Sequence, residues 1–342
     1  MQLWQAGRCY NRVKTDANGV KTDKMTAKNV SIALVDYPGA LKSALFGFEE
    51  IFALVNGLCE KEKLSTRFST RIVAIDAIEP LSPGSRAKDL NHAFSVVILP
   101  PGIQAQACFQ PGRKITDWII SQHEGKAVIC SVCAGTFMLA ATGLLDQRSA
   151  TTHWGLADEF SRRFPDVRLE IDKIVINDGD LITAGGIMAW IDLALELVNV
   201  FAGRRVMQSL AKRLVIDSGV REQRYYSCFS PHFAHADKVI LRAQQFIADN
   251  YHDALSVAQL AELCCLSERM FLRRFVKATD LKPTEYMQRL RIQKACERIE
   301  ASDATFDCVA EQVGYKDISA FRKIFSRITG LTPQEFKKRF VK

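Results

Sequence analysis

The sequence predicts an α/β domain with a doubly wound, largely parallel sheet, followed by an all-α domain that contains two helix-turn-helix units. The first observation is length, because 342 residues correspond to two or three domains at roughly 100–200 residues each. The second is an alternation of short apolar strands with helical stretches up to residue 202, which is typical of a parallel sheet covered on both faces. The third is the loss of strand signals after residue 236, where only helical periodicity remains.

The α/β domain is expected over residues 29–202. Apolar runs predict strands at 30–36, 67–75, 94–99, 127–132, 173–177 and 181–184. Helical spacing predicts helices at 41–58, 113–124, 134–143, 154–163 and 187–201. Residues 1–28 are polar and without periodicity, which indicates a tail. Residues 203–235 are expected to connect the domains, with the linker at 217–235, and residues 236–342 to form the second domain.

The net charge of +8 is concentrated at one end of the chain. From residue 255 to residue 342, 17 Lys and Arg stand against 11 Asp and Glu, a net charge of +6, so the remainder carries only +2. A basic block on a near-neutral chain favours a polyanionic partner, although an ordinary solvated surface would give the same count.

The cysteines bound the cellular compartment and the metal chemistry. Cys130 and Cys133 form a C-x-x-C pair, but no second pair follows at zinc spacing, so neither a metal nor a cofactor is expected. Ten cysteines without an apolar leader indicate a reducing, cytoplasmic compartment. No run is long and apolar enough to predict a membrane partner.

The last hundred or so residues repeat themselves. Six residues of the first copy recur fifty positions later: Phe271, Phe275, Thr279, Leu281, Pro283 and Glu285 return as Phe321, Phe325, Thr329, Leu331, Pro333 and Glu335. Ala261-Glu262 returns as Ala310-Glu311 after 49 positions, so the second copy has one more residue at its turn. A duplicated helical unit that differs by one loop residue rarely arises by chance.

Each copy predicts a helix, a tight turn and a second helix. In the first copy, Ser256 and Gln259 form a capping box, residues 264–266 form the turn, and Ser267 caps the second helix. In the second copy, a helix at about 306–313 is followed by a turn at Gly314-Tyr315 and a cap at Asp317. Thr332-Pro333-Gln334-Glu335 predicts another capping box, with Pro at the first helical position.

This region closely resembles the AraC-type DNA-binding domain over about residues 236–342. The resemblance implies a long helix at about 283–300 and two units that enter successive major grooves of double-stranded promoter DNA. The implied base-reading residues are Arg269, Leu272, Arg273, Ile318, Ser319, Arg322 and Lys323. Cys265 stands where the family usually has Gly, and Leu272 is apolar, so the first unit is expected to read fewer bases than the second.

The sharpest feature of the first domain is Ser131-Val132-Cys133-Ala134-Gly135. It follows a strand and precedes a helix, which predicts that Cys133 lies on a tight strand-to-helix elbow. A thiol beside a helix N-terminus is expected to have a lowered pKa and to be reactive. The segment that ends at Gly102 follows another strand and is expected to offer backbone N–H groups to a ligand.

The same segments resemble the class I glutamine-amidotransferase-like fold of the intracellular cysteine peptidase family, from about residue 30 to residue 200. The closer match is to regulators that fuse this fold to an AraC-type domain. In the peptidase branch a His follows the Cys, but here Ala134 does, and Ala44 stands where the regulators often have an acidic residue. No enzyme activity is therefore expected. The ligand-binding residues expected around the elbow are Cys133, Ala134, Gly102, Glu50 and His153.

Four roles remain open for this domain. The alternatives are sensing of a small-molecule effector, dimerisation alone, hydrolysis of a substrate by Cys133, and a redox switch at Cys133. His153 could serve as a base or simply as a structural hydrogen-bonding group. The sequence favours a transcription regulator that activates its target genes, forms a homodimer, responds to a small metabolite and acts with RNA polymerase.

Overall fold

The computed structural model describes residues 29–78, 94–103, 106–219, 221–233 and 235–341. The tail expected over residues 1–28 lies outside them. The chain divides into two compact units, with Gln223 at the end of the first and Arg224 at the start of the second. The first unit thus extends beyond the expected limit at residue 202, because the helix α7 (Arg204–Leu214) packs on it.

The first unit is built on a six-stranded sheet, ordered β2-β1-β3-β4-β8-β7. The strands are β1 (Asn29–Asp36), β2 (Arg67–Ala74), β3 (Val96–Leu99), β4 (Val128–Val132), β7 (Val175–Asn177) and β8 (Leu181–Ala184). All neighbours are parallel except β7 and β8, which confirms the largely parallel sheet. Two further strands of two residues each, β5 (Ser149–Ala150) and β6 (Arg168–Leu169), were not predicted, because periodicity cannot show over two residues.

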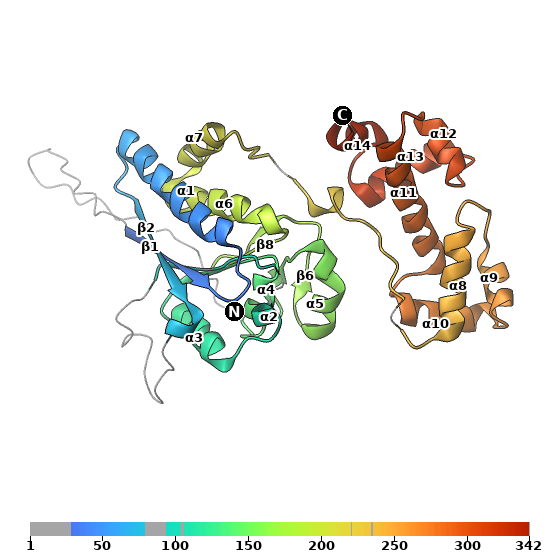
Figure 1. Ribbon diagram of the computed structural model, residues 1–342, viewed down its shortest axis with the longest axis horizontal. Helices are drawn as coiled ribbons and strands as arrows, with labels where there is room; N and C mark the ends of the chain where they lie inside the picture. Colours follow the sequence, from blue (N-terminus) through green and yellow to red (C-terminus); the bar gives the residue numbers. More distant parts are fainter. Residues whose placement is uncertain (1–28, 79–93, 104–105, 220, 234, 342) are drawn as a thin grey trace, which may run out of the picture. The chain divides into compact units, whose positions relative to one another are not determined.

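Helices cover both faces of this sheet, as Figure 1 shows. One face carries α1 (Lys42–Lys61), α6 (Trp190–Ala202) and α7, and the other carries α2 (Gln106–Phe109), α3 (Arg113–Glu124) and α4 (Gly135–Ala140). The helix α5 (Ala157–Arg163) follows a 3-10 turn. The predicted helix at 134–143 is shorter than expected, and the chain then turns through Gly143, which has a φ of +78°.

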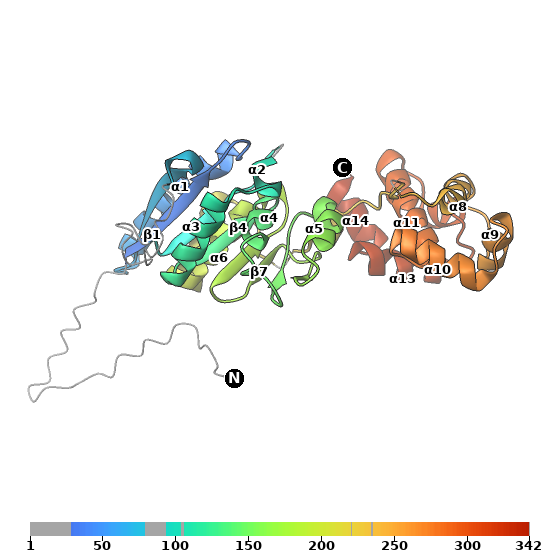
Figure 2. The same cartoon turned by 90° about the horizontal axis from the view of Figure 1, so that it is seen from below.

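In its described residues, the second unit contains seven helices: α8 (Lys238–Asp249), α9 (Val257–Leu263), α10 (Glu268–Thr279), α11 (Pro283–Ala301), α12 (Phe306–Gln312), α13 (Ile318–Thr329) and α14 (Pro333–Phe340). Figures 1 and 2 show α8, α9 and α10 gathered at one end of α11, with α13 and α14 at the other end. The buried side chains form two separate clusters, one for each end. The predicted duplication is therefore a duplication of small cores along one shared helix.

The helix caps predicted for this unit are present. Ser256 and Gln259 form one capping box, Thr332 and Glu335 form the other, and Ser267 and Asp317 cap α10 and α13. Within the ranges that the structure describes, no helix combines the length and the apolar character that a membrane span requires.

Candidate functional site

The first helix-turn-helix unit holds α10 by its buried face and leaves the opposite face open. Phe271 and Phe275 are completely buried against α8 and α9. The Arg274 guanidinium donates to both carboxylate oxygens of Asp237, at 2.8 and 2.6 Å, which fixes α10 to the start of α8. The predicted base-reading side chains are all exposed: Arg269, Leu272 and Arg273.

The second unit repeats this arrangement with a more polar open face. Phe321 and Phe325 are completely buried. Ser319, Arg322 and Lys323 are exposed, whereas Ile318 at the first position of α13 is half-buried. Arg322 forms an ion pair with Asp307 at 3.2 Å, but both side chains are more than half exposed. Such a pair contributes at most about 1 kcal/mol, so the Arg322 side chain can exchange this partner for DNA.

In the tight turn of each helix-turn-helix unit, one residue has a left-handed backbone conformation, and that residue differs between the units. Cys265 in the first turn has a φ of +53°, which disfavours a side chain. Gly314 in the second turn has a φ of +86°, and a Cβ there would lie 2.3 Å from the carbonyl oxygen of His252. Gly314 is required by close backbone packing as well as by φ, whereas Cys265 carries a strain that Gly would relieve.

Arg291, on α11, joins the two helix-turn-helix units. Its guanidinium donates to the carbonyl oxygens of Tyr251 and Asp253, both at 2.6 Å, in the loop between α8 and α9. It also donates to the carbonyl oxygen of Gly314 at 3.2 Å and lies over the Tyr315 ring, 5.5 Å from its centroid. Burial lowers the pKa of Arg291. These contacts fix the loop of one unit against the turn of the other, and sequence reasoning missed this residue.

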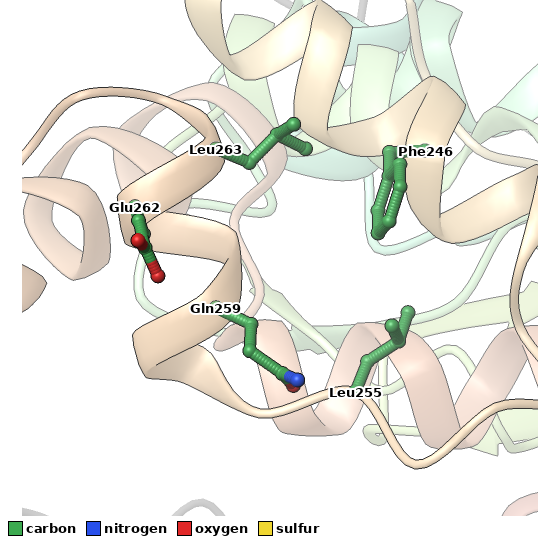
Figure 3. A pocket seen from close by; sticks show the side chains of 5 residues that line it. All are labelled: Phe246, Leu255, Gln259, Glu262 and Leu263. Atoms are coloured by element: carbon green, nitrogen blue, oxygen red, sulfur yellow. The ribbon is translucent and has the colours of Figure 1, made fainter.

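A small groove lies in the first helix-turn-helix unit, between the end of α8 and α9, with a volume of about 370 Å³ (Figure 3). It is lined by Phe246, Leu255, Gln259, Glu262 and Leu263. The Gln259 side chain is committed to the capping box of α9, so the groove offers an apolar wall and one carboxylate.

In the first domain, Cys133 lies on the predicted elbow between β4 and α4. Its φ of +56° is unusual for a residue with a side chain and is typical of nucleophile elbows. Gly135 permits the tight turn, because a Cβ there would lie 2.6 Å from the carbonyl oxygen of Leu99 at the end of β3. The backbone N–H of Cys133 donates to the carbonyl of Ala184, at the end of β8.

The expected lowering of the pKa of the thiol at this elbow is wrong. Cys133 is only 3 % exposed, and burial raises its pKa to about 11, although the backbone N–H of Ala134 opposes this rise. The elbow is enclosed by Tyr37, whose hydroxyl donates to the carbonyl of Pro100 at 2.6 Å, and by Cys108. Desolvation outweighs the field of α4, which has only six residues.

A buried network of hydroxyl groups supports the elbow from the side of β5. The Thr152 hydroxyl donates to the carbonyl oxygen of Cys133 at 2.8 Å. Thr136 bonds to Ser131 at 3.0 Å and to the carbonyl of Thr151 at 3.2 Å. The Thr-Thr pair that precedes His153 therefore holds the elbow, a role that sequence reasoning missed.

The other expected ligand-binding residues have different surroundings. Gly102 forms an antiparallel backbone bridge with Ala40. Glu50 is exposed on α1, and within the described ranges no hydrogen bond or ion pair joins it to the elbow. His153 accepts from the backbone N–H of Gly155 at 3.0 Å, and burial lowers its pKa. His153 is thus a local hydrogen-bonding group, one of the two roles left open for it.

Large apolar side chains are exposed on segments that follow the carboxyl ends of β1, β3 and β8. Phe46, near the start of α1, is 55 % exposed, and Ile103, after β3, and Met188, after β8, are each 57 % exposed. Ligands of open α/β sheets bind at the carboxyl ends of the strands. In the part of the chain that the structure describes, no cluster of three or more His, Cys, Asp or Glu could hold a metal ion.

Comparison with known sequences assigns the two regions to families. The sequence profile of the DJ-1/PfpI family matches residues 78–200, and that of a helix-turn-helix domain matches residues 260–339. The HTH-type transcriptional regulator ArgR of Pseudomonas aeruginosa is 26% identical over 61% of this chain, and the match covers 64% of ArgR. The HTH-type transcriptional regulator GlxA of Rhizobium meliloti is 22% identical over 77% of this chain and 85% of its own length.

An enzyme also occurs among the relatives. The isonitrile hydratase of Pseudomonas putida is 36% identical over 108 residues, which are 31% of this chain and 46% of the hydratase. The relatives matched over longer stretches, ArgR and GlxA, carry the names of transcriptional regulators. The chain therefore joins an N-terminal domain of the DJ-1/PfpI family to a C-terminal helix-turn-helix domain of the AraC type.

Proposed function

We propose that the chain is a sequence-specific transcription regulator that binds promoter DNA with both helix-turn-helix units. The observation that carries this proposal is the pair of exposed recognition faces on α10 and α13, one on each end of α11. The excess of basic residues after residue 255 supports contact with DNA phosphates. The regulator names of ArgR and GlxA support the same function.

Selection of genomic fragments tests this proposal. The purified full-length protein is mixed with fragmented genomic DNA at about 150 mM salt, where non-specific phosphate binding is weakened, and the bound fragments are sequenced. The proposal expects one recurring motif. Bound DNA with the composition of the input would show that the basic unit binds without specificity and would end the proposal.

The first domain, in the same proposal, binds a small metabolite at the carboxyl edge of its sheet. The site would include Cys133, Ala134 and Gly102, with Glu50 and His153 as candidates for its rim. The exposed apolar residues at this edge support a binding role for it. Binding would activate transcription by favouring one arrangement of a homodimer that engages RNA polymerase in the cytoplasm.

Thermal unfolding with pooled small metabolites tests this site, with Cys133→Ala as the comparison. A ligand that raises the melting temperature of both proteins is expected if binding needs the elbow but not the thiol of Cys133. The larger side chain of Cys133→Phe occupies the elbow. A ligand that still raises the melting temperature of this variant by the same amount binds elsewhere.

Cysteine hydrolysis is the second candidate function, favoured by the isonitrile hydratase relative and by the strained elbow. The buried thiol with its raised pKa argues against it. A thioester on Cys133 after incubation with an activated amide, or a thioimidate on Cys133 after incubation with an isonitrile, observed by mass spectrometry, would establish the enzyme reading. A protein that stays unmodified and without turnover would reject it.

A further inference from the structure

Residues 221–223 are firmly attached to the first unit, although the linker was expected to cover them. Arg221 forms an ion pair with Asp192, at the start of α6, at 2.5 Å. Glu222 forms an antiparallel backbone bridge with Lys173. The backbone N–H of Gln223 donates to the carbonyl of Asp172 at 2.8 Å. The connecting segment therefore leaves this unit only after Gln223.

The Gln223 side chain fills a cage of acceptors and is only 3 % exposed. Its Nε2 lies 2.8–3.1 Å from four oxygens: the Thr151 hydroxyl and the carbonyl groups of Thr152, Ile171 and Lys173. Its Oε1 accepts from the backbone N–H of Trp154 at 3.2 Å. Because the cage contains one donor and four acceptors, it fits an amide and rejects a carboxylate.

Gly185, directly after β8, makes room for this side chain. A Cβ at Gly185 would lie 1.9 Å from Nε2 of Gln223. Gly185 has no positive φ, so an Ala there would strain the contact with Gln223 and with the Thr152 carbonyl rather than its own backbone. Gly185 thus offers an independent way to displace Gln223.

Thr152 connects the cage to the elbow. Its hydroxyl donates to the carbonyl of Cys133 at 2.8 Å, and its own carbonyl accepts from Gln223 at 2.8 Å. A shift of the Cys133 backbone is passed to Gln223 through one buried residue. Buried hydrogen bonds of this kind are costly to break singly, because the remaining partner stays unsatisfied.

Residues 224–226 are attached to the second compact unit, which contains both helix-turn-helix units. Gly330, at the turn between α13 and α14, has room for no Cβ, because one would lie 2.5 Å from Nε of Arg224 and 2.8 Å from Cε1 of Tyr225. The Arg339 guanidinium lies over the Tyr225 ring, 5.1 Å from its centroid, and the Tyr226 and Phe340 rings meet at 5.6 Å. The attachment to the first unit ends at Gln223 and the attachment to the second begins at the next residue.

We propose that Gln223 is a positioning residue that couples the Cys133 elbow to the DNA-binding unit, by holding residues 221–223 in place until a ligand at the elbow shifts Thr152. This proposal rests on the effector and DNA-binding roles proposed above. Because Gln223 and Arg224 are adjacent in the chain, release of residues 221–223 lengthens the segment that is unattached between the two units.

The first test uses amide hydrogen exchange on the full-length protein with three variants. Gln223→Glu keeps the shape but loses the donors, Gly185→Ala expels the side chain, and Gln208→Glu makes the same chemical change at an exposed glutamine of α7. Exchange at residues 172–173 and 221–223 should rise about tenfold or more in the first two variants and stay at the wild-type rate in the third. Peptides of β1, β3 and β4 should keep their protection, which separates local release from unfolding.

The second test asks whether the coupling is specific, since a merely structural residue would also lose protection. Thr152→Val removes only the hydroxyl that reaches Cys133. It should speed exchange of the backbone N–H of Gln223. Its effect on affinity for the selected DNA should vanish when Gln223→Glu is already present. Unchanged exchange at residues 221–223 in Thr152→Val, or effects on affinity that add in the double variant, would overturn the proposal.

The two proposals fail in different ways. If wild-type protein selects no DNA motif, the regulator proposal fails, but the exchange measurements still report whether Thr152 and Gln223 are coupled. If a motif is selected and Gln223→Glu binds it with wild-type affinity and wild-type salt dependence, regulation through Gln223 fails alone.

Discussion

The two helix-turn-helix units share a scaffold and differ in what each presents and how its turn is made. In both, two phenylalanines one turn apart anchor the second helix, and both have a capped start. The first unit turns at strained Cys265 and presents apolar Leu272 and Met270 beside its arginines. The second turns at Gly314 and presents Ser319, Arg322 and Lys323. Fold and readout therefore depend on separate residues, so each can change without the other.

The largest effect is expected from removing one anchor in each unit. Phe275→Ala and Phe325→Ala each leave a cavity in a completely buried site and should cost about 3–5 kcal/mol. Because the two cores are separate, Phe275→Ala should abolish hydrogen-exchange protection in α9 and α10 and leave α12 and α13 protected. Loss of protection in all seven helices with either variant would show that the units fold as one.

Arg291 tests whether the two units are held in a fixed relation. Arg291→Met keeps the aliphatic stem but removes three hydrogen bonds to backbone carbonyls, which should cost about 2–3 kcal/mol in urea unfolding. It should also weaken discrimination against operators with one base pair inserted between the two contact blocks. Arg291→Lys, the control that keeps the charge, should recover only part of both. Full discrimination in Arg291→Met would mean that α11 alone sets the spacing.

The reading faces are compared by removing one arginine from each. Arg273→Ala and Arg322→Ala should each cost about 1–3 kcal/mol at the selected site and relax sequence preference in one contact block. Lys294→Ala removes the same charge from α11, outside both faces, and should leave preference unchanged. If Arg322→Ala lowers affinity equally for every sequence and flattens the salt dependence, Arg322 contacts phosphate and not bases.

The smallest expected effect concerns the turns. Cys265→Gly should stabilise the first unit by about 0.5–1 kcal/mol, since Gly accepts the positive φ without strain. In the second helix-turn-helix unit, Gly314→Ala should be destabilising by more than that, because the added Cβ would clash with the His252 carbonyl oxygen. Urea unfolding of both variants measures the contrast. A stabilising Gly314→Ala would show that the turn yields easily.

The sequence predicted elements far better than contacts between them. The capping residues, the duplicated phenylalanines and the elbow at Cys133 are local signals, and each was found where the sequence placed it. The raised pKa of Cys133 was missed, because burial by Tyr37 and Cys108 depends on segments distant in the sequence. Arg291 and Gln223 were missed for the same reason, since the carbonyl groups that they bind carry no sequence signature.

The end of the first domain was misjudged for a related cause. Residues 217–235 are polar, with Ser218-Gly219 and Ser230-Pro231, which is typical of a linker. Yet Gln223 is buried among acceptors of the first unit, and Tyr225 and Tyr226 pack on α14. Polar composition does not distinguish a linker from a segment whose polar side chain is buried and fully bonded.

The central claim is that both units read DNA, and hydroxyl-radical footprinting of the full-length protein on the selected fragment tests it most directly. We expect two protected blocks on one face of the duplex, separated by about one helical turn, or 10 base pairs. Arg273→Ala should weaken one block and Arg322→Ala the other. A single protected block that survives Arg273→Ala would contradict the claim and leave the second unit as the only reader.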